Sequence, residues 1–163
     1  MERVLIQSPD GRTYAQHIDF AAAARKLGVL PEVARNRIQL SLRWFTAADR
    51  ENGVDAYLKY WIALETLATN TTNINSLNDT LAATSKVSSQ KAKQDFRAGR
   101  LFDLRGRIVH GGYQKGLDAW LLKYIESLYI GALFQKIGME CERRAEYLLE
   151  DGKFEVSKYF SKS

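Results

Sequence analysis

Between Leu117 and Ile137, apolar residues recur every three or four positions. This spacing places side chains on the core-facing sides of an α-helix. Shorter stretches with the same spacing cover residues 34–45, 57–68 and 74–81, and the whole chain contains only two prolines. Because proline is the residue that helix interiors tolerate least, the pattern predicts an all-α fold, an up-and-down helical bundle.

The first 30 residues follow a different pattern. The run VLIQSPDGRTYAQ places a Ser-Pro-Asp-Gly turn signal between two short runs, which predicts a small hairpin or an extended arm. Asp19 can then cap a short helix that ends at Gly28. We divide the chain into an N-terminal arm and short helix (1–30), a helical bundle (31–151) and a C-terminal tail (152–163), which together most simply form one domain.

The stretches over 34–45 and 57–68 predict helices at about 31–48 and 54–69. Two more helices are expected at about 90–110 and 140–149. Pro31 stands where the first residue of a helix belongs. The helix over 90–110 stops at Gly111-Gly112, a pair typical of helix carboxyl ends. Its interior Gly99 marks a kink or a break.

The excess positive charge of the chain is concentrated in one segment. Seven of the 24 basic residues and two of the 19 acidic residues lie between Lys86 and Arg107, so this segment alone carries the net charge of +5. A concentrated basic segment is expected for a partner that bears phosphates, and a solvated helix face is the alternative. The candidate RNA-binding residues are Lys91, Lys93, Arg97 and Arg100.

Arg105 lies among apolar helix neighbours, because the positions three and four residues away are Leu101, Phe102, Ile108 and Val109. A guanidinium stays charged and is costly to bury alone. Arg105 should therefore meet a carboxylate or bind an anion in a cleft. For Arg107 an ion pair with Asp103, one turn earlier, is a sufficient structural explanation.

His110 and Glu65 are two further candidates. Gly106 lies one turn before His110 and can make room for its side chain, since glycine inside a helix otherwise costs about 1 kcal/mol relative to alanine. A structural explanation for His110 is that it caps the helix carboxyl end. Glu65 lies at the edge of a packed helix face, where a carboxylate needs a cationic partner, and Arg105 is the hypothetical one.

Two motifs resemble those of HEPN domains, most closely of the ApeA-like antiphage ribonucleases. Those domains combine a helix that bears an aLExL sequence with a later helix that ends in an Arg-x4-6-His motif. Here ALETL (63–67) is similar to the first motif and RGRIVHG (105–111) to the second. The resemblance covers about residues 34–137 and implies a HEPN-like bundle.

The resemblance implies metal-independent RNA cleavage by a homodimer, with both motifs in one cleft at the dimer interface. It makes Arg105 and His110 the catalytic residues, with Glu65, Gly106 and Arg107 in support. RNA supplies its own nucleophile, the 2′-OH, so the protein has to move protons and stabilise the phosphorane charge. Histidine suits the first task and arginine the second. The expected products are a 2′,3′-cyclic phosphate and a 5′-OH.

Two positions depart from the HEPN pattern. Gly106 stands where many active members have Asn after the Arg. Some toxin members continue as His-x-Tyr, with the tyrosine modified by a partner nucleotidyltransferase, whereas Tyr113 follows His110 one position too late. Two alternatives therefore stay open: a non-catalytic HEPN module that dimerises and binds RNA or a protein, and a regulatory domain from a longer protein.

Other classes of protein find no support in the sequence. The single cysteine, Cys141, cannot form an internal disulfide, which favours a reducing cytoplasm. The amino end turns polar after six residues, unlike a signal peptide, and the most apolar segment (120–134) is too short to span a bilayer. Gly-rich phosphate loops, HExxH and zinc-ligand spacings are missing from the sequence. We therefore expect a cytoplasmic protein without a membrane span, a metal or a cofactor.

Overall fold

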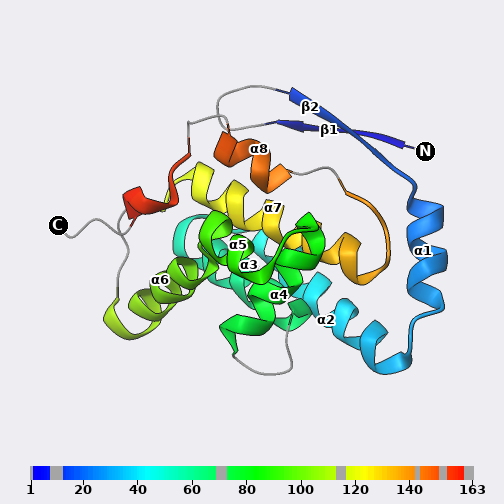
Figure 1. Cartoon of the computed structure of the whole chain (residues 1–163), viewed down its shortest axis with the longest axis horizontal. Coiled ribbons are helices and arrows are strands. Elements are labelled where there is room, and N and C mark those ends of the chain that lie inside the picture. The colour runs from blue at the N-terminus through cyan, green and yellow to red at the C-terminus, as the bar shows by residue number, and fades with distance from the viewer. Residues whose placement is uncertain are drawn as a thin grey trace.

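The computed structural model describes residues 2–7, 13–68, 73–112, 117–141, 144–150 and 154–159. Two strands come first, β1 (Glu2–Gln7) and β2 (Thr13–Ile18). The helices that follow are α1 (Phe20–Gly28), α2 (Glu32–Ala48), α3 (Gly53–Ala68), α4 (Ile74–Ser85), α5 (Ser89–Phe96), α6 (Ala98–Gly111), α7 (Ala119–Lys136), α8 (Arg144–Glu150) and the 3-10 helix η1 (Val156–Tyr159). The fold is an all-α bundle with an N-terminal hairpin, as the apolar spacing predicts (Figure 1).

The amino-terminal elements agree with the turn and cap signals of the sequence. β1 and β2 pair antiparallel, with Glu2 opposite Ile18, which is the predicted hairpin; the turn itself lies outside the described residues. Asp19 caps α1, because its carboxylate accepts the backbone N–H of Ala22 at 2.9 Å. Pro31 is the N-cap residue of α2 and not its first helical residue, since its ψ of 144° is extended.

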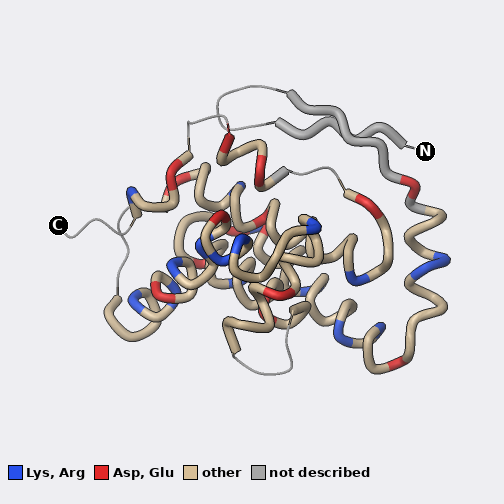
Figure 2. The backbone as a smooth tube through the Cα atoms, in the orientation of Figure 1, with Lys and Arg blue, Asp and Glu red and all other residues tan. Residues whose placement is uncertain are grey.

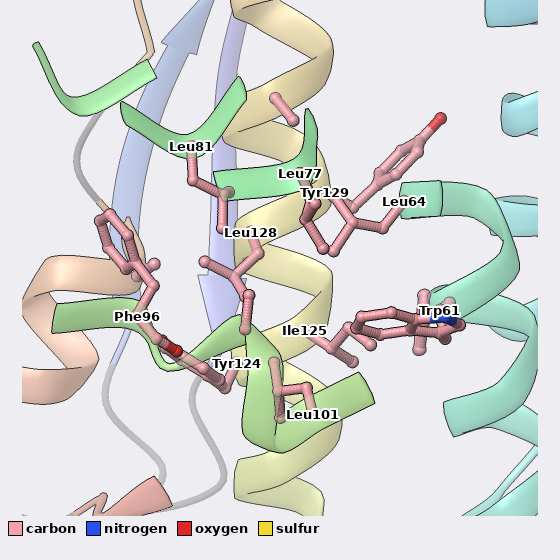
Figure 3. Close-up of a cluster of buried hydrophobic side chains, with 14 of the residues drawn as sticks. Trp61, Leu64, Leu77, Leu81, Phe96, Leu101, Tyr124, Ile125, Leu128 and Tyr129 are labelled. Carbon is pink, nitrogen blue, oxygen red and sulfur yellow. The ribbon is translucent and has the colours of Figure 1, made fainter. Parts of the chain in front are cut away.

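Helix α7 packs against α3, α4 and α8 (Figure 1). Because it has several neighbours, residues on more than one side of α7 are buried, which confirms the two-sided apolar pattern of the sequence. Figure 3 shows Ile125, Leu128 and Tyr129 of α7 in one cluster with Trp61 of α3. Full burial stabilises the fold by about 1.5–3 kcal/mol for each apolar side chain of this size.

Three buried tyrosines bring their hydroxyls to polar partners inside the bundle. Tyr57 donates to the carbonyl of Leu101 at 2.7 Å, and Tyr124 donates to the carbonyl of Phe96 at 2.8 Å. The Tyr129 hydroxyl lies 3.0 Å from a serine hydroxyl of α2. Burial raises the pKa of all three phenols, that of Tyr129 to about 12. The bundle therefore satisfies these polar groups while it excludes water from them.

The segment predicted as one helix over 90–110, with Gly99 at its kink, is two helices that meet at Arg97. Arg97 ends α5 in a left-handed conformation with φ of 51°. In a continuous helix the carbonyl of Phe96 would accept the N–H of Arg100. A buried tyrosine of α7 takes this carbonyl instead, and the N–H of Arg100 turns to the carbonyl of Arg97 at 2.9 Å. Tertiary packing, not glycine, thus sets the break.

The carboxyl-terminal part differs from the sequence prediction in two ways. A helix is expected over 140–149, but α8 begins at Arg144, and the described Glu140 precedes it. Inside the predicted tail (152–163), η1 packs against the bundle, because Tyr159 is buried and donates to a carboxylate oxygen of Asp118 at 2.6 Å. The described part of the tail is therefore attached to the amino end of α7.

Candidate functional site on helix α6

Helix α6 turns one side to the core and the other to solvent. Its core side consists of the buried Leu101, Leu104 and Ile108. The opposite side carries exposed residues at intervals of three and four, which we call the α6 stripe: Arg100, Asp103, Arg107 and His110. Figure 2 shows basic residues along α6 with an acidic residue between them. The stripe leads along the helix to the histidine in its last turn.

Helix α6 ends where the sequence predicts, because Gly112 takes a left-handed conformation with φ of 62° that suits glycine. The backbone N–H of Gly112 donates to the carbonyls of Arg107 and Ile108. His110 is exposed and forms no hydrogen bond or ion pair with any described residue. The backbone, and not the histidine side chain, therefore caps the carbonyls at this end of α6.

Arg105 lies at the edge of the core side of α6 and not within it. Of its helix neighbours, Ile108 is buried, whereas Phe102 is half-buried and Val109 is 51% exposed. Arg105 itself is half-buried and has neither a hydrogen bond nor an ion pair among the described residues. Its guanidinium thus keeps access to solvent, which removes the need for a carboxylate partner within the chain.

The hypothetical ion pair between Glu65 and Arg105 is not formed, although both residues belong to the described ranges. Helices α3 and α6 do meet, since the rings of Trp61 and Phe102 lie 6.0 Å apart. Glu65, one turn after Trp61 on α3, is half-buried. The contact between the two helices rests on these aromatic rings and on the Tyr57 hydrogen bond, so neither Glu65 nor Arg105 is needed to hold it.

Within one chain, α6 sends Arg105 and His110 in different directions. Five residues along a helix correspond to a rotation of about 140°, and only His110 belongs to the α6 stripe. The idea that Gly106 makes room for His110 is wrong, because a Cβ at Gly106 would meet nothing within 4 Å. A single subunit therefore does not bring the two predicted catalytic residues onto one phosphate.

The four candidate RNA-binding residues do not share one surface. Lys91 forms an ion pair with Asp95 at 2.8 Å, and Lys91 and Arg97 both line a groove that also contains carboxylates. Lys93 is exposed on α5 outside the lining of this groove. Arg100 belongs to the α6 stripe. The basic segment of the sequence is thus not one continuous phosphate track.

A groove that the sequence analysis missed lies between the α5–α6 corner and the α8–η1 segment. It encloses about 580 Å³. Its charged lining residues are Lys91, Asp95, Arg97, Glu146, Glu150 and Glu155, and Phe96, Phe154 and Val156 contribute apolar wall. Segments separated by about fifty residues form it, so no local sequence signal could have revealed it.

Three remaining points concern Tyr113, metal-ion ligands and membrane-spanning helices. Tyr113, the candidate modified tyrosine, lies outside the described ranges. Among the described residues, no three His, Cys, Asp or Glu side chains gather closely enough to hold a metal ion. No helix in these ranges has both the length and the apolar character needed to cross a membrane.

No protein-family model matches this chain, and no curated protein or solved structure matches it either. The resemblance to HEPN domains therefore rests on the sequences ALETL (63–67) and RGRIVHG (105–111). The all-α fold and the placement of His110 in the last turn of a helix are compatible with that resemblance.

Proposed function

We propose that this chain is a metal-independent endoribonuclease of the HEPN type that acts as a homodimer. One observation carries the proposal: Arg105 and His110, the catalytic residues of the HEPN resemblance, have no structural partner in the described part of the chain. An ion pair would explain Arg105 without catalysis, and a capping hydrogen bond would explain His110. Because neither interaction is formed, both side chains remain available to a phosphodiester.

A dimer can bring Arg105 and His110 together although they point in different directions on one helix. The side of α6 that bears Arg105 also carries the half-buried Phe102 and the exposed Val109, an apolar surface that a second subunit can cover. Across such an interface, the partner subunit's His110 can approach the Arg105 of the first subunit. Each phosphate then meets the arginine of one chain and the histidine of the other, at the dimer interface that the HEPN resemblance implies.

The chemistry needs only groups that the dimer and the RNA supply. One imidazole takes the proton of the 2′-OH, the 2′ oxygen attacks the phosphorus, and the bond to the 5′ oxygen breaks. The same imidazole, now protonated, gives a proton to that 5′ oxygen, which leaves a 2′,3′-cyclic phosphate and a 5′-OH. Arg105 stabilises the charge of the phosphorane through its planar pair of donors. We assign the flanking phosphates to Arg100 and Arg107 on the α6 stripe, because lysine and arginine side chains are the usual partners of phosphates.

The resemblance also supports a biological setting. It favours a cytoplasmic enzyme of antiphage defence or of a toxin system, whose activity a regulatory protein or a further domain controls. Neither setting changes the expected chemistry, since the bond that breaks and the residues that act on it are the same.

The alternative function is a non-catalytic HEPN module that dimerises and binds RNA or a protein. Gly106 favours this reading, because the position after the motif arginine is Asn in many active members. The open space around Gly106 shows that packing does not exclude a side chain there. A module without activity would keep the RNA affinity and the dimer while it cleaved nothing.

RNA cleavage in EDTA by the wild type and by His110→Ala tests the proposal. We expect the wild type to leave cyclic-phosphate ends and His110→Ala to cleave at least about 100-fold more slowly, the usual contribution of a general acid or base. His17→Ala is the matched control, because Arg12 and His17 have the same spacing as Arg105 and His110 but His17 lies on β2. Equal cleavage by the wild type and His110→Ala would contradict the assignment, and a dimer that binds RNA without cleaving it would favour the alternative.

A further inference from the structure

The groove between the α5–α6 corner and the α8–η1 segment contains a guanidinium that no described residue engages in a hydrogen bond or an ion pair. Arg97 lines this groove, is exposed, and forms no hydrogen bond or ion pair with the described residues. The other basic side chain of the lining, that of Lys91, is engaged by Asp95 at 2.8 Å. Among the described lining residues, Arg97 is thus the basic one that remains available to an anion from outside.

The backbone of Arg97 adopts a conformation that is unusual for a residue with a side chain. Its φ of 51° lies in the left-handed region, which favours glycine and is unfavourable for residues with a Cβ. Lys86, at φ of 55°, is the other described non-glycine residue of this kind, and its side chain pairs with Glu140 at 2.9 Å. Arg97 has the same backbone conformation, but its side chain forms no hydrogen bond or ion pair with the described residues, so it stays available to a ligand.

The corner that presents Arg97 is rigid. On one side the buried Tyr124 holds the carbonyl of Phe96, and on the other the buried Tyr57 holds the carbonyl of Leu101. Helix α6 begins immediately after Arg97 without a side-chain cap, so the positive end of its dipole lies beside the guanidinium. A guanidinium carried by a fixed backbone next to an uncapped helix start suits a carboxylate or a phosphate.

The opposite wall of the groove has the opposite charge. Glu146 and Glu150 are one turn apart on α8, and Glu155 follows at the start of the next segment. Like charges at this helical spacing repel each other. Glu150 has neither an ion pair nor a hydrogen bond with the described residues. Glu146 accepts a hydrogen bond from Ser85 at 2.6 Å, so Glu150 is the α8 carboxylate of the lining that a positively charged group can meet.

We infer that this groove binds a small zwitterion of the amino-acid type, whose carboxylate meets Arg97 and whose ammonium group meets Glu150 and Glu155. Apolar wall from Phe154 and Val156 accommodates an apolar side chain between the two charged ends. The volume of about 580 Å³ lies within the range of small-molecule sites. An RNA strand does not fit this groove, because the carboxylates would repel its phosphates. The inference is independent of the proposed ribonuclease activity.

Binding can be tested on the full chain with free L-leucine, L-methionine and L-phenylalanine as probes, by calorimetry and by thermal unfolding. Leucinamide lacks the carboxylate and N-acetylleucine lacks the ammonium group. We expect at least one of the three amino acids to bind and to raise the melting temperature, and we expect the two blocked leucines to bind at least tenfold more weakly than leucine. Binding of none of the three amino acids, or equal binding of the blocked forms, overturns the inference.

Arg97→Gly separates a ligand role from a structural one. It removes the guanidinium and relieves the left-handed backbone, so the variant should be at least as stable as the wild type and should lose amino-acid binding at least tenfold. Lys86→Gly is the matched control, because it makes the same backbone change outside the lining of this groove and should bind normally. Arg97→Lys keeps the positive charge and should retain measurable amino-acid binding. This variant replaces Arg97→Gly in the test if Arg97→Gly fails to fold. Unchanged amino-acid binding by Arg97→Gly overturns the inference. The inference is also overturned if the wild type binds no amino acid and Arg97→Gly loses RNA affinity.

Discussion

The buried tyrosines of the core and the two predicted catalytic residues of α6 differ in whether their polar groups have partners. In the core, the hydroxyls of Tyr57, Tyr124 and Tyr129 each have a partner within 3.0 Å. On α6, Arg105 and His110 have none among the described residues. Buried polar groups without partners are costly, so the core hydrogen bonds are what folding requires. Folding places no such requirement on the two α6 residues.

This contrast gives a criterion for separating structure from function. Substitutions in the α7 core should change the free energy of unfolding and reduce activity only through the loss of folded protein. Substitutions of Arg105 and His110 should leave the free energy of unfolding nearly unchanged and affect only RNA. The predictions below test this separation, beginning with the largest expected change in stability.

Trp61→Ala should produce the largest loss in the free energy of unfolding. Trp61 is 1% exposed and packs on Phe102 of α6, with the ring centroids 6.0 Å apart. Removal of a buried tryptophan side chain leaves a cavity, and we expect the free energy of unfolding to fall by about 3–5 kcal/mol. Urea unfolding followed by circular dichroism measures it. A loss below 1 kcal/mol would mean that the α3–α6 contact is not part of the core.

Alkaline pH should destabilise the core next. Burial raises the pKa of Tyr57 and Tyr124, and raises that of Tyr129 to about 12. Because these values lie above the usual value of 10, the stability that the neutral phenols provide is complete below pH 10 and is lost as the pH rises past it. We expect a loss of roughly 1 kcal/mol for each buried tyrosine at pH 11. Urea midpoints that stay constant from pH 9 to 11 would contradict the burial of these hydroxyls.

Tyr124→Phe should weaken the corner between α5 and α6. The change leaves the buried carbonyl of Phe96 without its donor, and we expect a loss of about 1–3 kcal/mol in the free energy of unfolding. Tyr129→Phe is the control with a smaller loss, because its partner Ser41 keeps a hydrogen bond to the carbonyl of Ile38 at 2.8 Å. Equal losses in the two variants would show that the Phe96 carbonyl does not depend on Tyr124.

The helices were predictable because their determinants are local. Periodic apolar residues, the Asp19 cap and the Gly111-Gly112 stop are all visible within a few positions of the elements they define, and the structure agrees with them. The break at Arg97 was not predictable. It depends on Tyr124, which is distant in sequence and takes the carbonyl that a continuous helix would use.

The candidate site was predictable in its residues but not in its surroundings. Sequence spacing identifies Arg105 and His110, and helical geometry gives the angle between them. The sequence suggested an ion pair between Glu65 and Arg105, because both residues have apolar helix neighbours. It could not show that both side chains are only half-buried in the folded chain. The groove beside Arg97 was not predictable at all, since α8 and η1 come to it from a distant part of the chain.

Gly106→Ala should raise stability slightly and sharpen the contrast within α6. A Cβ at this position meets nothing within 4 Å, and alanine is favoured over glycine inside a helix by about 0.5–1 kcal/mol. We expect a gain of this size in the free energy of unfolding of the isolated subunit, measured by urea unfolding at low protein concentration. Gly131→Ala is the control with the opposite sign, because its Cβ would lie 3.0 Å from a methyl carbon of Thr84.

Arg105→Ala and His110→Ala should produce the smallest changes in stability. Neither side chain has a hydrogen bond or an ion pair to lose within the described part of the chain, so we expect changes within about 0.5 kcal/mol, the usual range for surface substitutions. The measurement is urea unfolding of both variants beside Leu104→Ala, a fully buried neighbour on the same helix that should lose about 2–5 kcal/mol. A loss above 1 kcal/mol for Arg105→Ala or His110→Ala would give that residue a structural role. A stable variant that no longer cleaves RNA would instead place its role in the chemistry, because the fold, unlike the reaction, does not depend on that side chain.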